Sequence, residues 1–412
     1  MKLRQYFPLF WIALAGTFHL AGYEFVRSPS NTLFKAKFGV EGLPYAMATM
    51  PFIVFLVIAF YNKSLRRWGA APTLLGSVVL SISFLMICAF GINHQVSWMS
   101  LPLYYVREAY VVLLIEQFWS FINSFYSDES AKKMNGWVTG FTSLGAIGGG
   151  VLLSDWVIRW GTPHMIYVGA LLLVPVGIFC FLAYRSAYAQ FGYRRLEPET
   201  SRDTFGWQAF QRNPVLIWIL IVILVTQALS ASLMLSFQNE LQKAFSDPDL
   251  QTAYSGAFFA KVNFGSGIFQ FLMTPLLFHF LSLRFIHWFL PIIHVFSIGI
   301  FLIEPSLQTA SFSYLLFKSI DYSLFRNAKE RLYIPLSFEA RYQSKQWIDT
   351  FGYRVGKGGT SFLVIVLQKM SVPLHTLSGA VALIGALSWF GSSLFMMKED
   401  QKNRTKSPSL KV

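Results

Sequence analysis

The chain has 412 residues, of which 54% are hydrophobic and 13% charged, and its formal net charge is +14. Apolar runs of about 20 residues recur along it, the length needed to cross a hydrocarbon core of roughly 30 Å. This composition excludes a soluble globular protein, and alternating strands of the barrel type are absent from the sequence. We therefore predict an all-α polytopic membrane protein that spans a lipid bilayer.

The positive charge is concentrated in the predicted loops. Most of the 34 lysines and arginines lie in segments that fall on one side of the predicted helices, and the positive-inside rule places these segments in the cytoplasm. We expect an inner-membrane protein with both termini cytoplasmic, no nucleic-acid partner and a monomeric working form. Residues 1–5 are a short basic lead without a small-residue cleavage site, so the first apolar run is expected to remain as a helix.

Twelve membrane-spanning helices are predicted, six on each side of a basic linker. The halves are residues 1–184 and 215–397, the linker is 185–214, and residues 398–412 form a basic tail. This six-plus-six plan is that of the major facilitator fold, in which the substrate site lies where the halves meet. The first four helices are expected at 7–27, 43–61, 72–91 and 101–126; the fifth begins near 136 and the sixth ends near 184; the rest begin near 215, 253, 285, 311, 346 and 376.

The first predicted helix carries ionisable side chains on one face. His19, Tyr23 and Arg27 recur every four residues, and Glu24 precedes Arg27 by three, so a Glu24–Arg27 pair is feasible. Alternatively, Arg27 extends to the outer interface and Glu24 only neutralises it. Charge inside a membrane is costly and usually marks a pathway or a site, which favours a functional role.

The helix at 101–126 holds a second group. Glu108, Glu116 and Asn123 follow helical spacing along one face, whereas Arg107 points about 100° away. Two carboxylates in one span must be paired, protonated or facing water. The helix that begins near 136 carries six glycines, which indicate close helix packing and leave a gating role open.

The second half carries its charges in three places. Lys261 stands alone in the eighth predicted helix, with Asn263 two residues on, whereas Lys318 and Asp321 are three apart and expected to pair. Residues 326–345 are expected to be mostly a cytoplasmic loop. The best site candidate is a stripe in the eleventh helix, at four-residue spacing, that consists of Asp349, Tyr353 and Lys357. Neighbouring glycines would let a ligand or another helix approach it closely.

Signals for an enzyme are missing from the sequence. The run Gly356-Lys357-Gly358-Gly359 lacks the glycine spacing of a phosphate-binding loop and lies in a predicted span. The seven histidines form no cluster with metal-ligand spacing, and no serine or cysteine has the context of a catalytic triad. We therefore expect no catalytic activity, no metal and no cofactor.

Several motifs resemble one known family. The segment 318–359 contains Tyr322-Ser323-Leu324-Phe325, Lys329-Glu330, Tyr333-Ile334-Pro335-Leu336, Lys345, Ile348-Asp349 and Gly356-Lys357-Gly358-Gly359. This pattern resembles the nucleotide transporter family, the ATP/ADP translocases of plastids and intracellular bacteria. Glu108 followed by Phe118-Trp119-Ser120-Phe121-Ile122-Asn123, and Arg27 followed by Asn31-Thr32-Leu33, are also similar to segments of that family.

The resemblance implies a transporter of nucleotides, with Glu108 and Lys329 at charged positions of the family. Two departures stand out, because the family's first-helix lysine would fall at Ser30 and its seventh-helix glutamate near Met234. Lys261 has no counterpart in the family pattern. The resemblance therefore implies fold and transport more firmly than an exchange of ATP for ADP.

We predict a secondary transporter that moves a nucleotide or another phosphate-bearing anion by alternating access. The alternatives are a major facilitator-type transporter of a different solute or of a phospholipid, and a non-transporting scaffold or sensor with the same fold. The predicted substrate-binding residues supply cationic contacts and the acids and polar groups that hold them; they are Arg27, Arg107, Glu108, Glu116, Asn123, Lys261, Lys329, Asp349, Tyr353 and Lys357.

Overall fold

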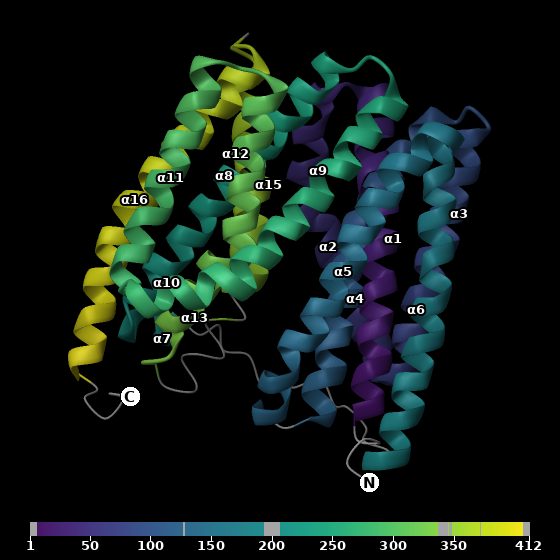
Figure 1. Cartoon of the computed structure of the whole chain (residues 1–412), viewed down its shortest axis with the longest axis horizontal. Coiled ribbons are helices and arrows are strands. Elements are labelled where there is room, and N and C mark those ends of the chain that lie inside the picture. Colours follow the sequence, from purple (N-terminus) through teal and green to yellow (C-terminus); the bar gives the residue numbers. More distant parts are fainter. Residues whose placement is uncertain are drawn as a thin grey trace. The chain divides into compact units, whose positions relative to one another are not determined.

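The computed structural model describes residues 6–126, 128–192, 207–336, 345, 348–370 and 372–406, and every regular element within these ranges is a helix (Figure 1). Eight of the described helices are long and apolar enough to cross a membrane. The prediction of an all-α polytopic membrane protein is confirmed. The count of twelve spans stays a prediction.

The chain divides into two compact units that do not follow the midpoint of the sequence. Unit 1 comprises Met1–Gly39, Phe52–Thr200 and Phe245–Phe264, and unit 2 comprises Val40–Pro51, Ser201–Ala244 and Gly265–Val412. Each unit therefore contains one short segment from the other half of the chain. The two exchanged segments belong to the helices α2 (Leu43–Trp68) and α9 (Pro248–Ile268).

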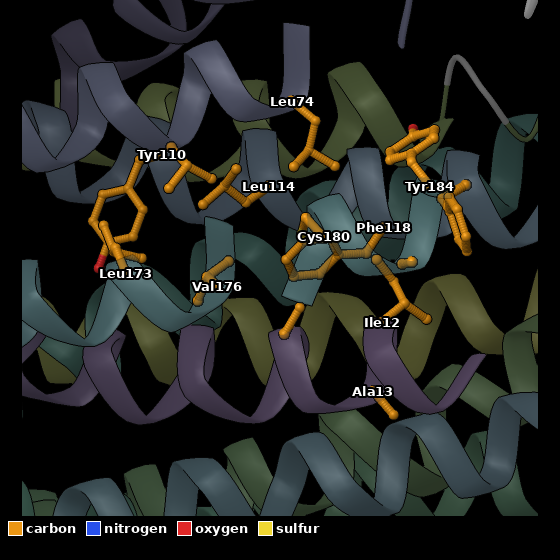
Figure 2. Packing of buried hydrophobic residues seen from close by; sticks show 14 of the residues in the cluster. Ile12, Ala13, Leu74, Tyr110, Leu114, Phe118, Leu173, Val176, Cys180 and Tyr184 are labelled. Carbon is orange, nitrogen blue, oxygen red and sulfur yellow. The ribbon is translucent and has the colours of Figure 1, made fainter. Parts of the chain in front are cut away.

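Unit 1 is built around its first helix. In Figure 1 this helix, α1 (Phe7–Phe38), is purple, and it packs against α4 (Ser100–Phe125), α5 (Asp128–Trp160) and α6 (Thr162–Phe191). The helix α3 (Ala70–Asn93) covers α4 and α6. Figure 2 shows Ile12, Phe118 and Cys180 meeting in the apolar cluster between these helices. The short helix η3 (Ser97–Met99) precedes α4.

The helices α1 and α2 are longer than the sequence predicted. α1 does not end near residue 27 but continues through Pro29 to Phe38, and α2 continues through the expected basic loop to Trp68. Residues 28–35 of α1 are rich in polar side chains, and for this reason the apolar pattern in the sequence stops near residue 27. Most of these residues are nevertheless buried. Burial against neighbouring helices supports a helix where the apolar pattern stops.

The glycines of α5 pack against α1. A Cβ added to Gly145 would overlap the carbonyl of Thr17, and one added to Gly149 would overlap the backbone of Ala21. Only glycine allows two helix backbones to approach this closely. The packing role predicted for these glycines is confirmed at both positions.

Unit 2 is organised around α8 (Val215–Ala244). This helix packs against α12 (Leu307–Ile320), α15 (Tyr353–Gln368) and α16 (Leu374–Lys406), and α11 (Leu283–Ile303) packs against α12 and α16. The remaining short elements of this unit are α7 (Trp207–Arg212), α10 (Thr274–Phe280), α13 (Arg326–Tyr333) and η2 (Val40–Gly42).

Three π-helical turns interrupt the helices of this part of the chain. They are η4 (Phe269–Met273), which joins α9 to α10, η5 (Asp321–Phe325), which joins α12 to α13, and η6 (Ile348–Gly352), which precedes α15. Residues 326–333, the first part of the predicted loop 326–345, form the helix α13, which follows α12 through η5, whereas residues 337–344 lie outside the described residues. Single π turns inside α-helices often accompany functional sites.

Candidate functional site

The buried guanidinium of Arg107 joins α4 to α1. Its Nη1 donates to the Arg27 carbonyl (3.1 Å), to Ser30 Oγ (3.1 Å) and to Asn31 Oδ1 (2.6 Å), and its Nη2 donates to Glu108 Oε1 (2.6 Å). The Arg107 side chain is only 2% exposed. Four acceptors therefore fix one cation in place before any substrate arrives, which is the preorganisation that a binding site needs.

A second ion pair continues this network along α1. Arg27 Nη2 donates to Glu24 Oε1 (2.6 Å), and the amide of Asn263 on α9 donates to the same oxygen (3.1 Å). The guanidinium carbon of Arg27 lies 3.4 Å from the centroid of the Phe259 ring. The predicted Glu24–Arg27 pair is confirmed. The Arg27 side chain is only 14% exposed, so it is largely buried within unit 1.

We call the group Glu24, Arg27, Ser30, Asn31, Arg107 and Glu108, together with Asn263, the Arg107 cluster. It contains two guanidinium groups and two carboxylates, so its formal charges balance. The Glu108 side chain is 22% exposed, whereas those of Glu24 and Arg107 are 2% exposed. Glu108 is therefore the most accessible member of these pairs, and an incoming anion can compete for Arg107 at this point.

The sequence predicted some of this cluster and missed the rest. The pairing of Arg107 with Glu108 was not expected, because adjacent helix residues do not face each other; the long arginine side chain bends to reach both Glu108 and α1. Ser30 and Asn31 were treated as lying beyond the helix, and Phe259 was not considered. The polar run Ser-Pro-Ser-Asn-Thr directly after Arg27 was the signal for a buried polar segment.

Three predicted site residues lie away from the Arg107 cluster. Glu116 and Asn123 are exposed on α4, about 12 Å and about 22 Å along the helix from Glu108 at roughly 1.5 Å per residue. Lys261 is exposed on α9. In the sequence, Lys261 lies between Phe259 and Asn263, which contact the Arg107 cluster from one face of α9. Because Lys261 is two residues from each of them, its side chain points to a different side of the helix.

Lys329 is the centre of a second cluster, in unit 2. Its Nζ lies 2.5 Å from Asp349 Oδ1 and 5.4 Å from the centroid of the Tyr353 ring. Glu330 is 3.9 Å from the same nitrogen and also accepts a hydrogen bond from Lys345 (2.7 Å). We call these five residues the Lys329 cluster. The Lys329 side chain is only 4% exposed, so this lysine is buried and ion-paired on α13 instead of solvated in a loop.

The π turn η6 changes the predicted stripe of the eleventh helix. Asp349 lies inside η6, and Tyr353 begins α15 directly after it. A π turn contains more residues than an α turn, so the four-residue spacing does not run unbroken from Asp349 to Lys357. Asp349 and Tyr353 both contact Lys329, while partly buried Lys357 lies one turn further along α15.

The glycines of α15 serve helix contacts. A Cβ added to Gly356 would overlap Leu224 and Gln227 of α8, and one added to Gly358 would overlap Pro51 of α2. Of the two roles left open for these glycines, the approach of another helix is the one observed. Gly359, by contrast, has open space where a Cβ would be.

Lys318 and Asp321 do not form the expected direct ion pair. Lys318 Nζ donates instead to Ser230 Oγ on α8 (2.9 Å) and lies 4.9 Å from the centroid of the Tyr322 ring. No ion pair between Lys318 and Asp321 lies within 4.0 Å in the described part of the chain. Asp321 begins the π turn η5, so residues three apart here do not have the relative positions that they have in a regular α-helix.

The described residues contain no group of three or more histidine, cysteine or acidic side chains that could hold a metal ion. The two histidines of α11 are buried among rings. His294 stacks on Trp389 (5.6 Å between centroids), and His287 meets the edge of Phe325 (6.4 Å). These histidines are packing residues of unit 2.

A known family model matches part of the second half of the chain. Residues 268–392 match the model of the TLC ATP/ADP transporter family. This range includes the Lys329 cluster and α15. It also includes the motif on which the resemblance to nucleotide transporters was based, so that resemblance is confirmed.

One curated relative extends the likeness over most of the chain. ADP,ATP carrier protein 1 of Chlamydia muridarum (strain MoPn / Nigg) is 24% identical over 428 residues, which cover 90% of this chain and 77% of the carrier. Because the match covers 90% of this chain, it extends into the first half.

Solved structures confirm the fold class. The nucleoside transporter NupG is 11% identical with a TM-score of 0.65, and the match covers 97% of this chain and 99% of that one. The D-xylose-proton symporter is 15% identical with a TM-score of 0.63, covering 95% and 97%. The predicted major facilitator-like fold is confirmed.

Proposed function

Because this chain is related to the TLC ATP/ADP transporter family and has a major facilitator-like fold, we propose that it is a secondary transporter of a nucleotide or another phosphate-bearing anion. It moves its substrate by alternating access. Transport, and not catalysis, is the activity that the related proteins' names carry. These relationships do not favour the alternative of a non-transporting scaffold.

The observation that carries this proposal is the fixed guanidinium of Arg107. A phosphate oxygen that replaces Glu108 as acceptor gains a charge-assisted hydrogen bond from a donor that three other groups already hold in place. The displaced Glu108 carboxylate then takes up a proton or turns to water. Substrate binding and the state of this ion pair are thereby linked, and such a linkage biases one conformation over another.

The Lys329 cluster supplies a second switchable ion pair. Lys329 is held by Asp349 and packs on Tyr353, and these residues belong to different helices, α13, η6 and α15. Breaking this pair frees a buried cation, which is costly unless an anion replaces the carboxylate. A phosphate-bearing substrate meets that condition.

We also propose where and how the protein works. It resides in the inner membrane with both termini in the cytoplasm, as the distribution of positive charge supports, and it functions as a monomer. Labelling of single cysteines placed in the two termini, in intact cells and in broken cells, tests the topology.

Uptake into proteoliposomes tests the proposed function. Purified protein is reconstituted and offered labelled ATP, ADP, other common nucleotides and adenosine, and protein-free liposomes are the control. We expect uptake of at least one nucleotide and none of adenosine, because adenosine lacks the phosphate that Arg107 is proposed to bind. Uptake of adenosine or a sugar without any nucleotide would remove the phosphate claim and leave a transporter of another solute.

Lys357→Ala is expected to abolish uptake with little loss of folded protein. Lys357 is partly buried on α15, one turn beyond Tyr353, where it is proposed to contact the substrate. The matched control is Lys369→Ala, which removes an exposed lysine at the end of the same helix. Size-exclusion yield and initial uptake rate are measured for both. Unchanged uptake by Lys357→Ala would exclude this residue from the site.

A further inference from the structure

Unit 1 contains an apolar groove between α2, α3 and α4. It is a cavity of about 750 Å³ whose walls are formed by Phe60 and Trp68 of α2, Gly76 and Phe84 of α3, and Tyr105 and Leu113 of α4. None of the residues assigned to the Arg107 cluster lines it. The groove is therefore separate from the proposed transport site.

Small side chains on α3 and α4 create this groove. Gly76, Ser77, Ser81 and Ala109 line it, opposite the large rings of α2. The hydroxyls of Ser77 and Ser81 donate back to the carbonyls of Thr73 and Ser77 (2.8 and 2.7 Å). Since these two hydroxyls are satisfied within α3, the groove offers mainly apolar surface, which favours an occupant that is apolar along most of its length.

One end of the groove meets a cluster of positive charge. Ser64 and Trp68 line the groove, and on the same turns of α2 the side chains of Lys63, Arg66 and Arg67 are exposed. The Arg67 guanidinium lies 5.9 Å from the centroid of the Trp68 ring. The segment 62–69, NKSLRRWG, contains three cations and no acid. An occupant that is apolar along its length and anionic at one end fits both features.

We propose that the α2–α3–α4 groove binds one anionic phospholipid. One acyl chain lies along Gly76 and Ala109, and the headgroup phosphate lies against Arg66 and Arg67. An acyl chain gains by covering apolar surface in a groove of this kind, and clustered Lys and Arg at the end of a membrane helix attract anionic headgroups. The site goes beyond the proposed transport function, because its lipid is bound and not transported.

Native mass spectrometry of the full-length protein tests this site. Detergent-solubilised protein is titrated with phosphatidylglycerol or with phosphatidylcholine, and the fraction carrying one lipid is measured. We expect phosphatidylglycerol to bind more tightly. The double variant Arg66→Gln/Arg67→Gln should weaken phosphatidylglycerol binding roughly tenfold or more and leave phosphatidylcholine binding nearly unchanged. Lys398→Gln/Lys402→Gln, which removes two exposed cations of α16, is the charge-matched control and should change neither.

A second variant tests the acyl-chain part of the site. Gly76→Leu fills the groove, and its fold should survive because a Cβ at Gly76 meets no atom within 4 Å. We expect it to lose the single bound lipid of either kind. Gly299→Leu, in α11, is the control, since Gly299 also has open space and lies outside the groove.

Two outcomes would overturn the proposal. One is equal binding of phosphatidylglycerol and phosphatidylcholine by the unaltered protein, and the other is retention of the bound lipid by Gly76→Leu at the level of Gly299→Leu. Neither outcome bears on nucleotide uptake, which is measured separately.

Discussion

Replacing Arg107 with glutamine is expected to abolish uptake and to lower stability more than any other single change considered for unit 1. The change leaves Asn31, Ser30 and Glu108 without their donor, and breaking a buried ion pair typically costs about 3–5 kcal/mol. The melting temperature in detergent, with and without the best substrate, and the initial rate of uptake are the measurements.

Two further variants make this result specific. Arg107→Lys keeps the charge but cannot reach α1 and Glu108 together in the same way, so it should restore part of the stability and little of the uptake. Arg159→Gln removes an exposed arginine whose nearest carboxylate, on Asp155, is 3.6 Å away; surface pairs contribute about 0–1 kcal/mol. A melting temperature of Arg107→Gln equal to that of Arg159→Gln would contradict the cluster as described.

The Lys329–Asp349 pair is expected to show strong coupling in a double-mutant cycle. Lys329→Met leaves Asp349 without its buried partner, and Asp349→Asn leaves Lys329 charged and nearly buried. Each single change should destabilise the protein, and the two together should cost less than their sum, with a coupling of about 1–3 kcal/mol. Thermal unfolding of the four proteins in one detergent gives the coupling.

A neighbouring ion pair provides the control for this cycle. Lys345 and Glu330 are 2.7 Å apart, and their side chains are 42% and 38% exposed. The same cycle on that pair should give a coupling of about 0–1 kcal/mol, because water screens it. If the coupling energy of the Lys329–Asp349 pair were no larger than that of the Lys345–Glu330 pair, burial of Lys329 would not strengthen its ion pair.

The sequence was sufficient to predict the fold class and the helices that carry charge. Long apolar runs predicted a helical membrane protein with a major facilitator-like fold, and the motif around Lys329 and Lys357 carried the resemblance to nucleotide transporters. The Glu24–Arg27 pair was also predictable, because it depends only on a three-residue spacing within one helix.

The contacts between helices were not predictable in the same way. The sequence does not reveal that Arg107 turns from its own face of α4 towards Asn31, because that choice depends on how α1 and α4 pack. Nor does the sequence reveal that α1 continues past Pro29, because the residues after Pro29 are less apolar although they are just as buried. Glu116 and Asn123 were assigned to the site because they share a face of α4 with Glu108, but a shared face does not bring residues together: at roughly 1.5 Å per residue they lie about 12 Å and about 22 Å along the helix from Glu108.

The π turns η5 and η6 have a consequence for how related sequences are compared. A π turn contains one residue more than an α turn, so a relative that has an α turn at the same place would need a single-residue gap there. An alignment that forbids such gaps would set Asp321 or Asp349 against the wrong neighbour and shift every following side chain by about 100°. Conversely, deleting one residue from η6 would leave the composition almost unchanged and still turn Asp349 away from Lys329.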